Sequence, residues 1–443
     1  MSLSILKMLK AYKDEDTLRL HMPGHKGRLP YALDAAYDVT EIKGIDDLQA
    51  PTQALAWAQE AAAEVNGAGK TMLSTCGSTA AVTAMLLAVS GRKVIATRDC
   101  HRSAISAIAL GGIDAVFAAP QADASDISKL ICEHTDAAAV YITYPDYYGR
   151  CCDIAAIAEA AKEAGMALLV DNAHGAHFPY SSALPVTPSY VHADAWAQSA
   201  HKTLPALTQA AYLHIGRSSP LEDRLRRAFW MVHSSSPSYL IMLSLDAARE
   251  YMQTEADING WISECKRARE RINRLGGYRC AEREGAYDYD VTRLNIITEG
   301  RGYTGYEADA ELRKAGVQAE MADISGVVLI TAPGQKLDRL ILALDGLKQR
   351  LPVTNTDTSM PLLPPAALSV RQAMMSDCES VDTRLCSGRI CAEATGAYPP
   401  GIAAVVPGEI ITDEIIEYFN NIKDAGAAMF GERNGRLSVL RKK

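Results

Sequence analysis

The chain has 443 residues, of which 48% are apolar and 22% charged, and its formal net charge is −8. These proportions are ordinary for a globular protein, and the length exceeds one compact core, so we expect two or three domains. The mild acidity argues against a nucleic-acid-binding protein, which would present a basic face. Neither a secretory signal nor an apolar run of the roughly 18 residues that span a bilayer is evident, so we predict a cytoplasmic protein without a membrane segment.

The ten cysteines are scattered, apart from the adjacent pair Cys151 and Cys152, and they form no C-x-x-C motif. Such usage is typical of reduced thiols in a cytosolic protein. It gives no ligand spacing for a metal, so we predict no metal site.

The chain order suggests an N-terminal arm and two larger units. Residues 1–44 combine a short amphipathic helix with the Gly/Pro-rich loop HMPGHKGRLP. Residues 45–255 alternate apolar runs with helical patterns, which predicts a largely parallel sheet covered by helices on both faces. The expected strands are 93–97, 115–118, 139–144, 167–171, 195–199 and 210–215, and one connecting helix is 154–164.

Residues 256–443 are expected to form a smaller α+β part. It shows three helical patterns, a pair of strands, a Pro-rich connector and a last helix that starts at Thr412. The helices are expected at 260–275, 305–314 and 337–351, the strands at 294–298 and 327–330, and the connector at 351–365. Whether the connector is a linker or a packed loop stays open.

The most informative cluster is SAHKT at 199–203, which follows an expected strand. Burial would lower the pKa of Lys202 and free its amine to attack an aldehyde. Ser199 and His201 flank it and could hydrogen-bond a phosphate. A single lysine in a turn is more often an ordinary surface residue, so this cluster needs support from elsewhere.

Asp171 supplies that support, because it ends the apolar strand ALLV. A buried carboxylate needs a partner, and a protonated pyridine nitrogen is a suitable one. The cationic ring would then act as an electron sink. A helix N-cap is the alternative for an isolated Asp. Asp171 at one strand end and Lys202 at a later one together predict a site for pyridoxal 5'-phosphate.

Two weaker clusters fit the same site. Gly77, Ser78 and Thr79 precede the apolar run AAVTAMLLAV, and the start of such a helix favours an anion such as phosphate. His101 follows another strand and could stack on a flat ring, although a surface loop histidine is equally compatible with the pattern.

These stretches resemble the Orn/Lys/Arg decarboxylase family of fold-type-I pyridoxal-phosphate enzymes, in a short form without an N-terminal wing domain. The matching motifs are HMPGHKG (21–27), GIDDLQAP (44–51), GST (77–79), CHRS (100–103), DNAHGAHF (171–178), SAHKTLPALTQAAYLHI (199–215), SSSPSYLIMLSLDAAR (234–249) and YPPGIAAVVPGE (398–409). They follow the family order through nearly the whole chain.

The resemblance implies a role for each matching residue. Lys202 would carry the cofactor as a Schiff base, with Asp171 on the pyridine nitrogen and His101 on the ring. His174 would lie beside the Schiff base, and Ala173 would contact the cofactor. The phosphate group would be held by Gly77, Ser78, Thr79, Ser199 and His201, and by Ser235 or Ser236 of the neighbouring subunit of a homodimer or a multiple of it.

The implied reaction is removal of carbon dioxide from arginine, lysine or ornithine to give a polyamine or its precursor. Lys202 or His174 would return a proton to Cα. The acidic residues considered for the distal amine of the substrate are Glu393, Glu409, Asp46 and Asp47.

Four positions depart from the family pattern. Asn172 stands where Glu is usual, Cys76 where Asn is common, and Ala403 and Ala404 where Pro-Leu follows PPGI. None belongs to the Lys202–Asp171 pair, so cofactor binding is expected to hold, whereas substrate identity and full activity stay open. One rival is an aminotransferase or lyase of the same fold, in which Arg293 would clamp the α-carboxylate. The other is a cofactor-binding relative that has lost activity.

Overall fold

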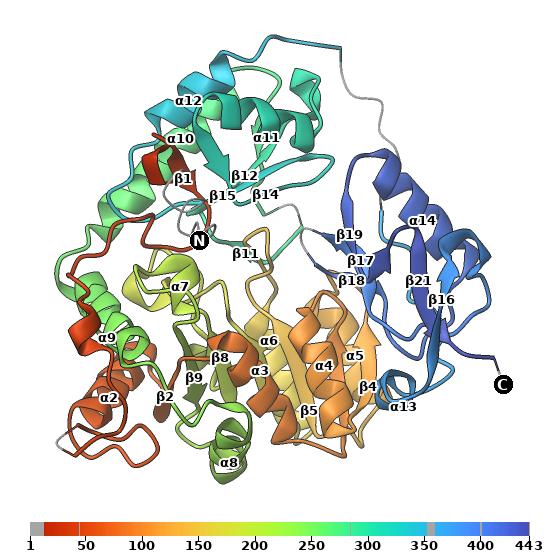
Figure 1. Ribbon diagram of the computed structural model, residues 1–443, viewed down its shortest axis with the longest axis horizontal. Coiled ribbons are helices and arrows are strands. Elements are labelled where there is room, and N and C mark those ends of the chain that lie inside the picture. Colours follow the sequence, from red (N-terminus) through yellow and green to blue (C-terminus); the bar gives the residue numbers. More distant parts are fainter. Residues whose placement is uncertain (1–12, 44, 284, 352–358, 399–400, 443) are drawn as a thin grey trace, which may run out of the picture.

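The computed structural model describes residues 13–43, 45–283, 285–351, 359–398 and 401–442. Its largest sheet has seven strands and lies at the bottom of the view in Figure 1. The strand order is β2 (Lys70–Ser74), β9 (Ala211–Ile215), β8 (Ala195–Gln198), β7 (Ala167–Asp171), β5 (Ala139–Thr143), β3 (Lys93–Thr97) and β4 (Asp114–Ala118). Only β9 runs antiparallel to its neighbours in this sheet. The predicted α/β sheet is therefore confirmed, although β2 was not expected.

Helices cover both faces of this sheet. One face carries α3 (Gly77–Leu87), α4 (Arg102–Gly111) and α8 (Glu222–Val232), which share one apolar core. A second core lies under α2 (Ala54–Asn66), α5 (Ala124–Glu133), α6 (Ile154–Glu163) and α9 (Tyr239–Thr254). Because the sheet is covered on both sides, its central strands are buried along their length, as β7 and β8 are.

The second unit begins with α10 (Ile258–Arg274) and contains its own antiparallel sheet. The strand order is β10 (Arg279–Cys280), β12 (Arg293–Ile297), β15 (Gly326–Ile330) and β14 (Met321–Ala322). Helices α11 (Gly305–Lys314) and α12 (Asp338–Asp345) belong to this unit. The expected helix 337–351 is thus too long. It ends at Asp345, because the guanidinium of Arg301 takes the carbonyls of Asp345 and Leu347.

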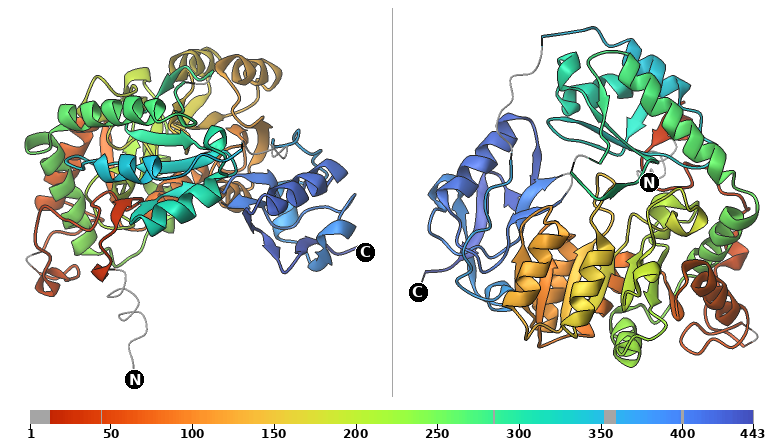
Figure 2. Two further views of the ribbon diagram at one scale, coloured as in Figure 1. Left: turned by 90° about the horizontal axis from the view of Figure 1, so that it is seen from above. Right: turned by 180° about the vertical axis from the view of Figure 1, so that it is seen from behind.

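The C-terminal residues form a further compact group around a third apolar core, drawn in blue in Figures 1 and 2. Two three-stranded sheets, β16-β21-β20 and β18-β17-β19, pack with α14 (Asp413–Asp424), which Thr412 caps as expected. The elements are α13 (Val370–Met374), β16 (Cys378–Asp382), β17 (Thr395–Tyr398), β18 (Ala403–Val405), β19 (Ala428–Phe430), β20 (Glu432–Arg433) and β21 (Arg436–Leu440). Residues 352–358 of the predicted connector 351–365 lie outside the described residues.

The N-terminal arm joins distant parts of the chain. Strand β1 (Leu18–Leu20) pairs in parallel with β13 (Val317–Ala319) of the second unit. The following loop packs against α7 (Ala200–Thr203), where Gly24 donates its N–H to the carbonyl of His201 at 2.6 Å. A Cβ on Gly24 would lie 2.4 Å from the Leu204 carbonyl oxygen, so the close approach requires glycine. The amphipathic helix expected before β1 lies outside the described residues.

The smaller structural elements complete the described chain. The short strands β6 (Arg150–Cys151) and β11 (Asp288–Tyr289) pair with each other and link the large sheet to the second unit. The 3-10 turns are η1 (Ala35–Tyr37), η2 (Phe178–Tyr180), η3 (Pro188–Val191), η4 (Glu299–Arg301) and η5 (Thr383–Leu385). None of the described helices is both long and apolar enough to cross a membrane.

A buried ion pair docks the C-terminal group onto the large sheet. Arg98, which follows β3, is fully buried, and its Nη1 lies 2.9 Å from a carboxylate oxygen of Glu409. Its Nη2 donates to the other carboxylate oxygen of Glu409, and the guanidinium also donates to the carbonyls of Ala403 and Ala404 at 3.0 and 3.2 Å. Since these contacts use main-chain oxygens, the departure from Pro-Leu at 403 and 404 leaves the docking intact.

Removing the charge of Glu409 would leave the Arg98 cation buried without its counter-ion. We predict that Glu409→Gln lowers the free energy of unfolding by about 3 kcal/mol, as expected when one partner of a buried pair is lost. Glu222→Gln is the matched control, because it breaks the exposed pair with Lys70 and should cost less than about 1 kcal/mol. Urea unfolding followed by fluorescence measures both, and equal small effects would contradict the structural role of the pair.

Candidate active site

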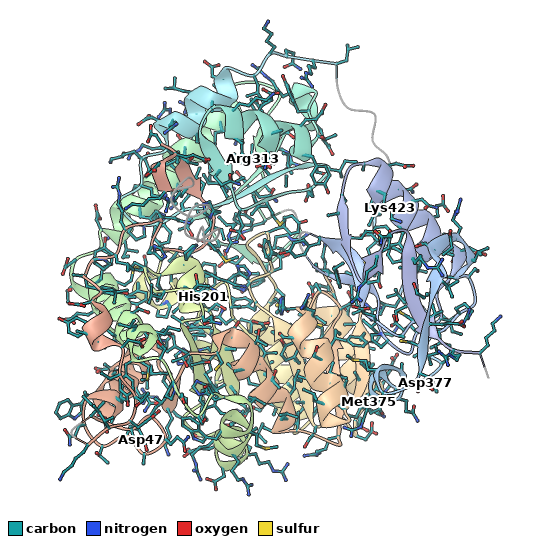
Figure 3. All side chains as sticks on the ribbon, viewed as in Figure 1. Asp47, His201, Arg313, Met375, Asp377 and Lys423 are labelled. Carbon is teal, nitrogen blue, oxygen red and sulfur yellow. The ribbon has the colours of Figure 1, made fainter. Side chains whose placement is uncertain are left out.

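A cleft of about 690 Å³ lies where the carboxyl ends of the large-sheet strands face the two smaller groups. Ten of the predicted site residues line it, from four separate stretches of sequence. They are Gly77, Ser78, Thr79, His101, Asp171, Ala173, His174, Ser199, His201 and Lys202. Figure 3 labels His201 near the middle of the molecule, in agreement with this location. The carboxyl-end rule for parallel sheets thus brings together residues up to 125 positions apart.

Lys202 lies on α7, the single helical turn that follows β8. Its Nζ is 3.0 Å from Nε2 of His174. Burial, aided by the Arg293 cation, lowers the pKa of Lys202 to about 8 against the raising effects of Asp171 and Glu320. With this pKa about a tenth of the amine is neutral at pH 7 and about half at pH 8, far more than for an unperturbed lysine, and the neutral amine is the state that attacks an aldehyde.

Asp171 ends β7 and is only 3% exposed. It accepts hydrogen bonds from the hydroxyl of Tyr141 and the N–H of Ala173, each at 3.1 Å. The ion pairs among the described residues include none with Asp171. Its carboxylate therefore retains the capacity to hold a buried cation, and a protonated pyridine nitrogen would fit it.

The opposite end of the cleft offers groups for an anion. Ser78 lies in the first turn of α3, whose N–H groups point along the helix axis, and its hydroxyl accepts from Ser199 at 2.7 Å. His201 shares a hydrogen bond between Nδ1 and the Ala210 carbonyl, so its Nε2 would donate to a phosphate only in the charged form. Burial lowers the pKa of His201 to about 4, and a phosphate would have to raise it.

His101 presents a neutral ring to the cleft. It caps α4, with Nδ1 accepting from the N–H of Ser103 at 3.2 Å, and burial lowers its pKa. A buried, unpaired carboxylate, a low-pKa lysine, a helix start with hydroxyls and a neutral ring between them fit pyridoxal 5'-phosphate. The individual roles of these residues stay proposals.

Two expectations about the site are not met within one chain. Ser235 and Ser236 are exposed and do not line the cleft, although Ser234 N–H contacts Sγ of Cys76 at 3.4 Å. The four acidic residues considered for the substrate amine do not line it either. Glu409 pairs with Arg98, and Glu393 pairs with Arg433.

The N-terminal pair of acidic candidates lies elsewhere. Asp46 accepts from three N–H groups at the start of α2. Asp47 is half-buried, and Figure 3 shows it at the lower left edge, far from His201. Asp47 accepts from the N–H of Gln49 in the preceding loop, so both carboxylates have local backbone partners.

Three other carboxylates line the cleft instead: Asp99, Asp146 and Asp323. Asp99 and Asp146 follow β3 and β5, so the carboxyl-end rule applied to every strand would have found them. Asp323 precedes β15 of the second unit, and only the tertiary structure brings it here. Burial, and then Asp146, raise the pKa of Asp99 to about 6.

The departure at Asn172 has a structural explanation. Its Nδ2 donates to the Tyr144 carbonyl at 2.6 Å, and its Oδ1 accepts from Gln198 at 2.9 Å. The chain continues from Gln198 to His214 and from His214 to Thr71 at 3.0 and 2.7 Å. Burial lowers the pKa of His214 to about 3, so every member of this chain is neutral and the amide of Asn172 matches it.

The low pKa of Lys202 has a measurable consequence. We predict that the rate at which cofactor-free protein forms a visible adduct with pyridoxal 5'-phosphate rises about tenfold per pH unit below a midpoint near pH 8 and then levels off. An unperturbed lysine would keep gaining rate towards about pH 10.4. Lys202→Ala should abolish the adduct, and a midpoint near 10 would contradict the desolvation of this amine.

The sequence and fold match proteins of known class. The patterns of the Orn/Lys/Arg decarboxylase major domain and C-terminal domain match residues 4–299 and 353–432. Arginine decarboxylases of Bacillus subtilis and Halalkalibacterium halodurans are each 32% identical to this chain, over 98% and 97% of it and 96% and 95% of their own lengths.

The structural comparison supports the same fold. Lysine decarboxylase A from Pseudomonas aeruginosa superposes with a TM-score of 0.77 at 19% identity, over 91% of this chain and 74% of that one. The constitutive lysine decarboxylase of E. coli superposes with a TM-score of 0.70 at 18% identity, over 87% and 72%. At such identities the likeness concerns the fold, and the sequence matches carry the assignment: the chain belongs to the Orn/Lys/Arg decarboxylase family.

Proposed function

We propose that this protein removes the α-carboxyl group of a basic amino acid as carbon dioxide, with pyridoxal 5'-phosphate on Lys202. The observation that carries the proposal is the meeting of the Lys202 amine and the unpaired Asp171 carboxylate in one cleft. Two arginine decarboxylases among the relatives make arginine the first substrate to test. The product would be a polyamine or its precursor.

The bound cofactor would supply the electron sink for the bond that breaks. The neutral Nζ of Lys202 is the nucleophile that would bind it. Asp171, buried and held by Tyr141, would keep a positive charge on the pyridine nitrogen. His174 holds a nitrogen 3.0 Å from Nζ of Lys202 and is placed to deliver a proton to Cα.

We further propose Asp99 as the first acceptor for the distal cation of the substrate. Asp146 is paired with Arg150, and Asp323 accepts from Tyr148 and from two backbone N–H groups. Asp99 takes part in none of the ion pairs between described residues. Its raised pKa indicates a carboxylate that a nearby cation would stabilise.

The aminotransferase alternative receives little support from the geometry. Arg293 does not line the cleft and is 1% exposed, because His174 and the carbonyl of Tyr147 take its guanidinium N–H groups. An α-carboxylate clamp would need those groups to face the substrate. A measurement of catalytic activity distinguishes the proposed enzyme from a cofactor-binding relative that has lost activity.

Carbon dioxide release from arginine, lysine and ornithine tests the function. We predict release from at least one of them, and a loss of roughly a hundredfold in kcat for Asp171→Asn with the cofactor still bound, since each lost decade corresponds to about 1.4 kcal/mol of transition-state stabilisation. Tyr141→Phe is a milder companion, because it removes one hydrogen bond and leaves the charge. No release from any of the three would reject the proposal.

We also propose that the active enzyme is a homodimer, or a multiple of it, with sites shared between subunits, and that it acts in the cytoplasm without a nucleic-acid partner. Ser235 and Ser236 are exposed and do not line the cleft of their own chain. This supports a contact between their hydroxyls and the phosphate site of the partner subunit. Pro237 follows them and disfavours helix in this loop.

Mixed dimers test the sharing. Lys202→Ala chains combined with Ser235→Ala/Ser236→Ala chains should give one doubly damaged and one intact site. Activity should then recover to about half of wild type per mixed dimer, the arithmetic of one working site in two. Wild type mixed with Lys202→Ala is the control and should give the same half. If verified mixed dimers stay inactive while the control works, each chain completes its own site.

A further inference from the structure

A buried hydrogen-bonded row connects the second unit to the reactive lysine. Nη2 of Arg293 lies 3.1 Å from Nδ1 of His174, and Nε2 of His174 lies 3.0 Å from Nζ of Lys202. Arg293 starts β12, whereas His174 and Lys202 follow β7 and β8 of the large sheet. The ring of Tyr147 packs edge-on against His174, with centroids 4.8 Å apart, and holds the imidazole in this orientation.

Donor and acceptor rules fix the protons in this row. A guanidinium only donates hydrogen bonds and does not lose its charge. Nδ1 of His174 must therefore accept from Arg293 and carries no proton. A neutral imidazole with a bare Nδ1 carries its proton on Nε2, the atom that faces Lys202.

The charges around His174 agree with this assignment. Burial, Lys202 and Arg293 lower its pKa well below the usual value, and His101 and His201 act in the same direction. The ring is thus neutral at physiological pH. Its Nε2–H can donate to Lys202 only where Nζ is neutral and has a free electron pair, and with a Lys202 pKa of about 8 that state predominates above about pH 8.

The buried positive charge of Arg293 is balanced by the carboxylate of Asp290. Asp290, which is 1% exposed, has a pKa near 2 in spite of burial, since His177 and then Arg293 lower it. His177 lies 3.1 Å from this carboxylate. The guanidinium bonds Nδ1 of His174, and Arg293 is not among the residues that line the cleft.

We propose that Arg293 is a positioning residue that fixes His174 as the Nε2–H tautomer, so that His174 always presents its proton to the reacting nitrogen at Lys202. The inference builds on the proposed function, because it specifies how the proton donor of that reaction is prepared. Without Arg293, the ring could place its proton on either nitrogen or become charged, and would present a lone pair to Lys202 in part of the molecules.

The test uses full-length protein freed of cofactor and labelled with nitrogen-15 on histidine. His174→Gln identifies the His174 signals among those of the ten histidines. We expect a single Nε2–H tautomer from about pH 8, where Nζ becomes neutral, to about pH 10 in wild type and in Arg293→Lys, which keeps a cationic donor. Arg293→Met should give mixed tautomers or an imidazolium that titrates, because a cation that lowers the pKa of His174 is gone.

Two further readouts separate positioning from mere structural support. The pH midpoint for adduct formation at Lys202 should rise in Arg293→Met, since Arg293 lowers that pKa, and the carboxylates of Asp171 and Glu320, which raise it, remain. For the loaded enzyme, kcat should fall roughly tenfold to a hundredfold in Arg293→Met, at or below the cost of losing a general acid, while Arg293→Lys restores most of it. Thermal melting checks that both variants are folded.

The outcomes distinguish this inference from the proposed function. A proton on Nδ1 of His174 in wild type, or an unchanged Nε2–H tautomer in folded Arg293→Met, would overturn the role of Arg293 even in an active enzyme. The expected tautomer in a protein that releases no carbon dioxide would overturn the proposed function and leave the assignment of Arg293 standing.

Discussion

Desolvation of one amine is the constraint around which the cleft is organised. Lys202 needs a neutral Nζ to react, and only burial among packed groups lowers its pKa towards neutrality. No single sheet end provides such burial. The large sheet supplies the lysine and its neighbours, the N-terminal loop packs on α7 through Gly24, and the second unit closes the side behind His174. The amine is therefore sensitive to contacts made by residues remote in sequence.

Charged side chains also join the separate units of the protein. Arg98 joins the large sheet to the C-terminal group, and Lys26 in the N-terminal loop donates to the carbonyls of His21 and Ile330 at 2.6 and 2.8 Å. Both cations contact main-chain oxygens, which any residue type supplies. The contacts thus survive side-chain replacement, and they are compatible with Ala403 and Ala404 at the positions where Pro-Leu usually follows PPGI.

Buried polar side chains beneath the cleft are satisfied by hydrogen bonds between neutral groups and not by ion pairs. The row runs from Asn172, just after β7, through Gln198 on β8 and His214 on β9 to Thr71 on β2, and its members are hydrogen-bonded without a formal charge. Replacing the usual Glu by Asn removes a second carboxylate from beside Asp171. Asp171 then remains the sole carboxylate at the end of β7, and its charge is free for a buried cation. The departure is thus a change of the supporting network, while the reactive pair is retained.

Sequence alone determined the features that depend on local pattern. The period of apolar residues indicated six strands of the large sheet, and the carboxyl-end rule placed Asp171, His101 and Lys202 together before any coordinates. The pattern missed β2, because KTMLS is only five residues long and mixes polar and apolar side chains. Family motifs predicted Ser78 and Ser199 as neighbours in one site, and the structure places their hydroxyl oxygens 2.7 Å apart.

Tertiary structure alone decided everything that depends on which units meet. Arg293 was considered as a carboxylate clamp, yet it faces the back of His174, because β12 presents it there and Tyr147 and His174 take its donors. Glu409 was considered for the substrate, yet Arg98 holds it in the interface between the units. Asp323 enters the cleft from a loop before β15 that carries no motif. A sequence encodes the type of each charge, but the partner that satisfies a buried charge is set by packing between segments hundreds of residues apart.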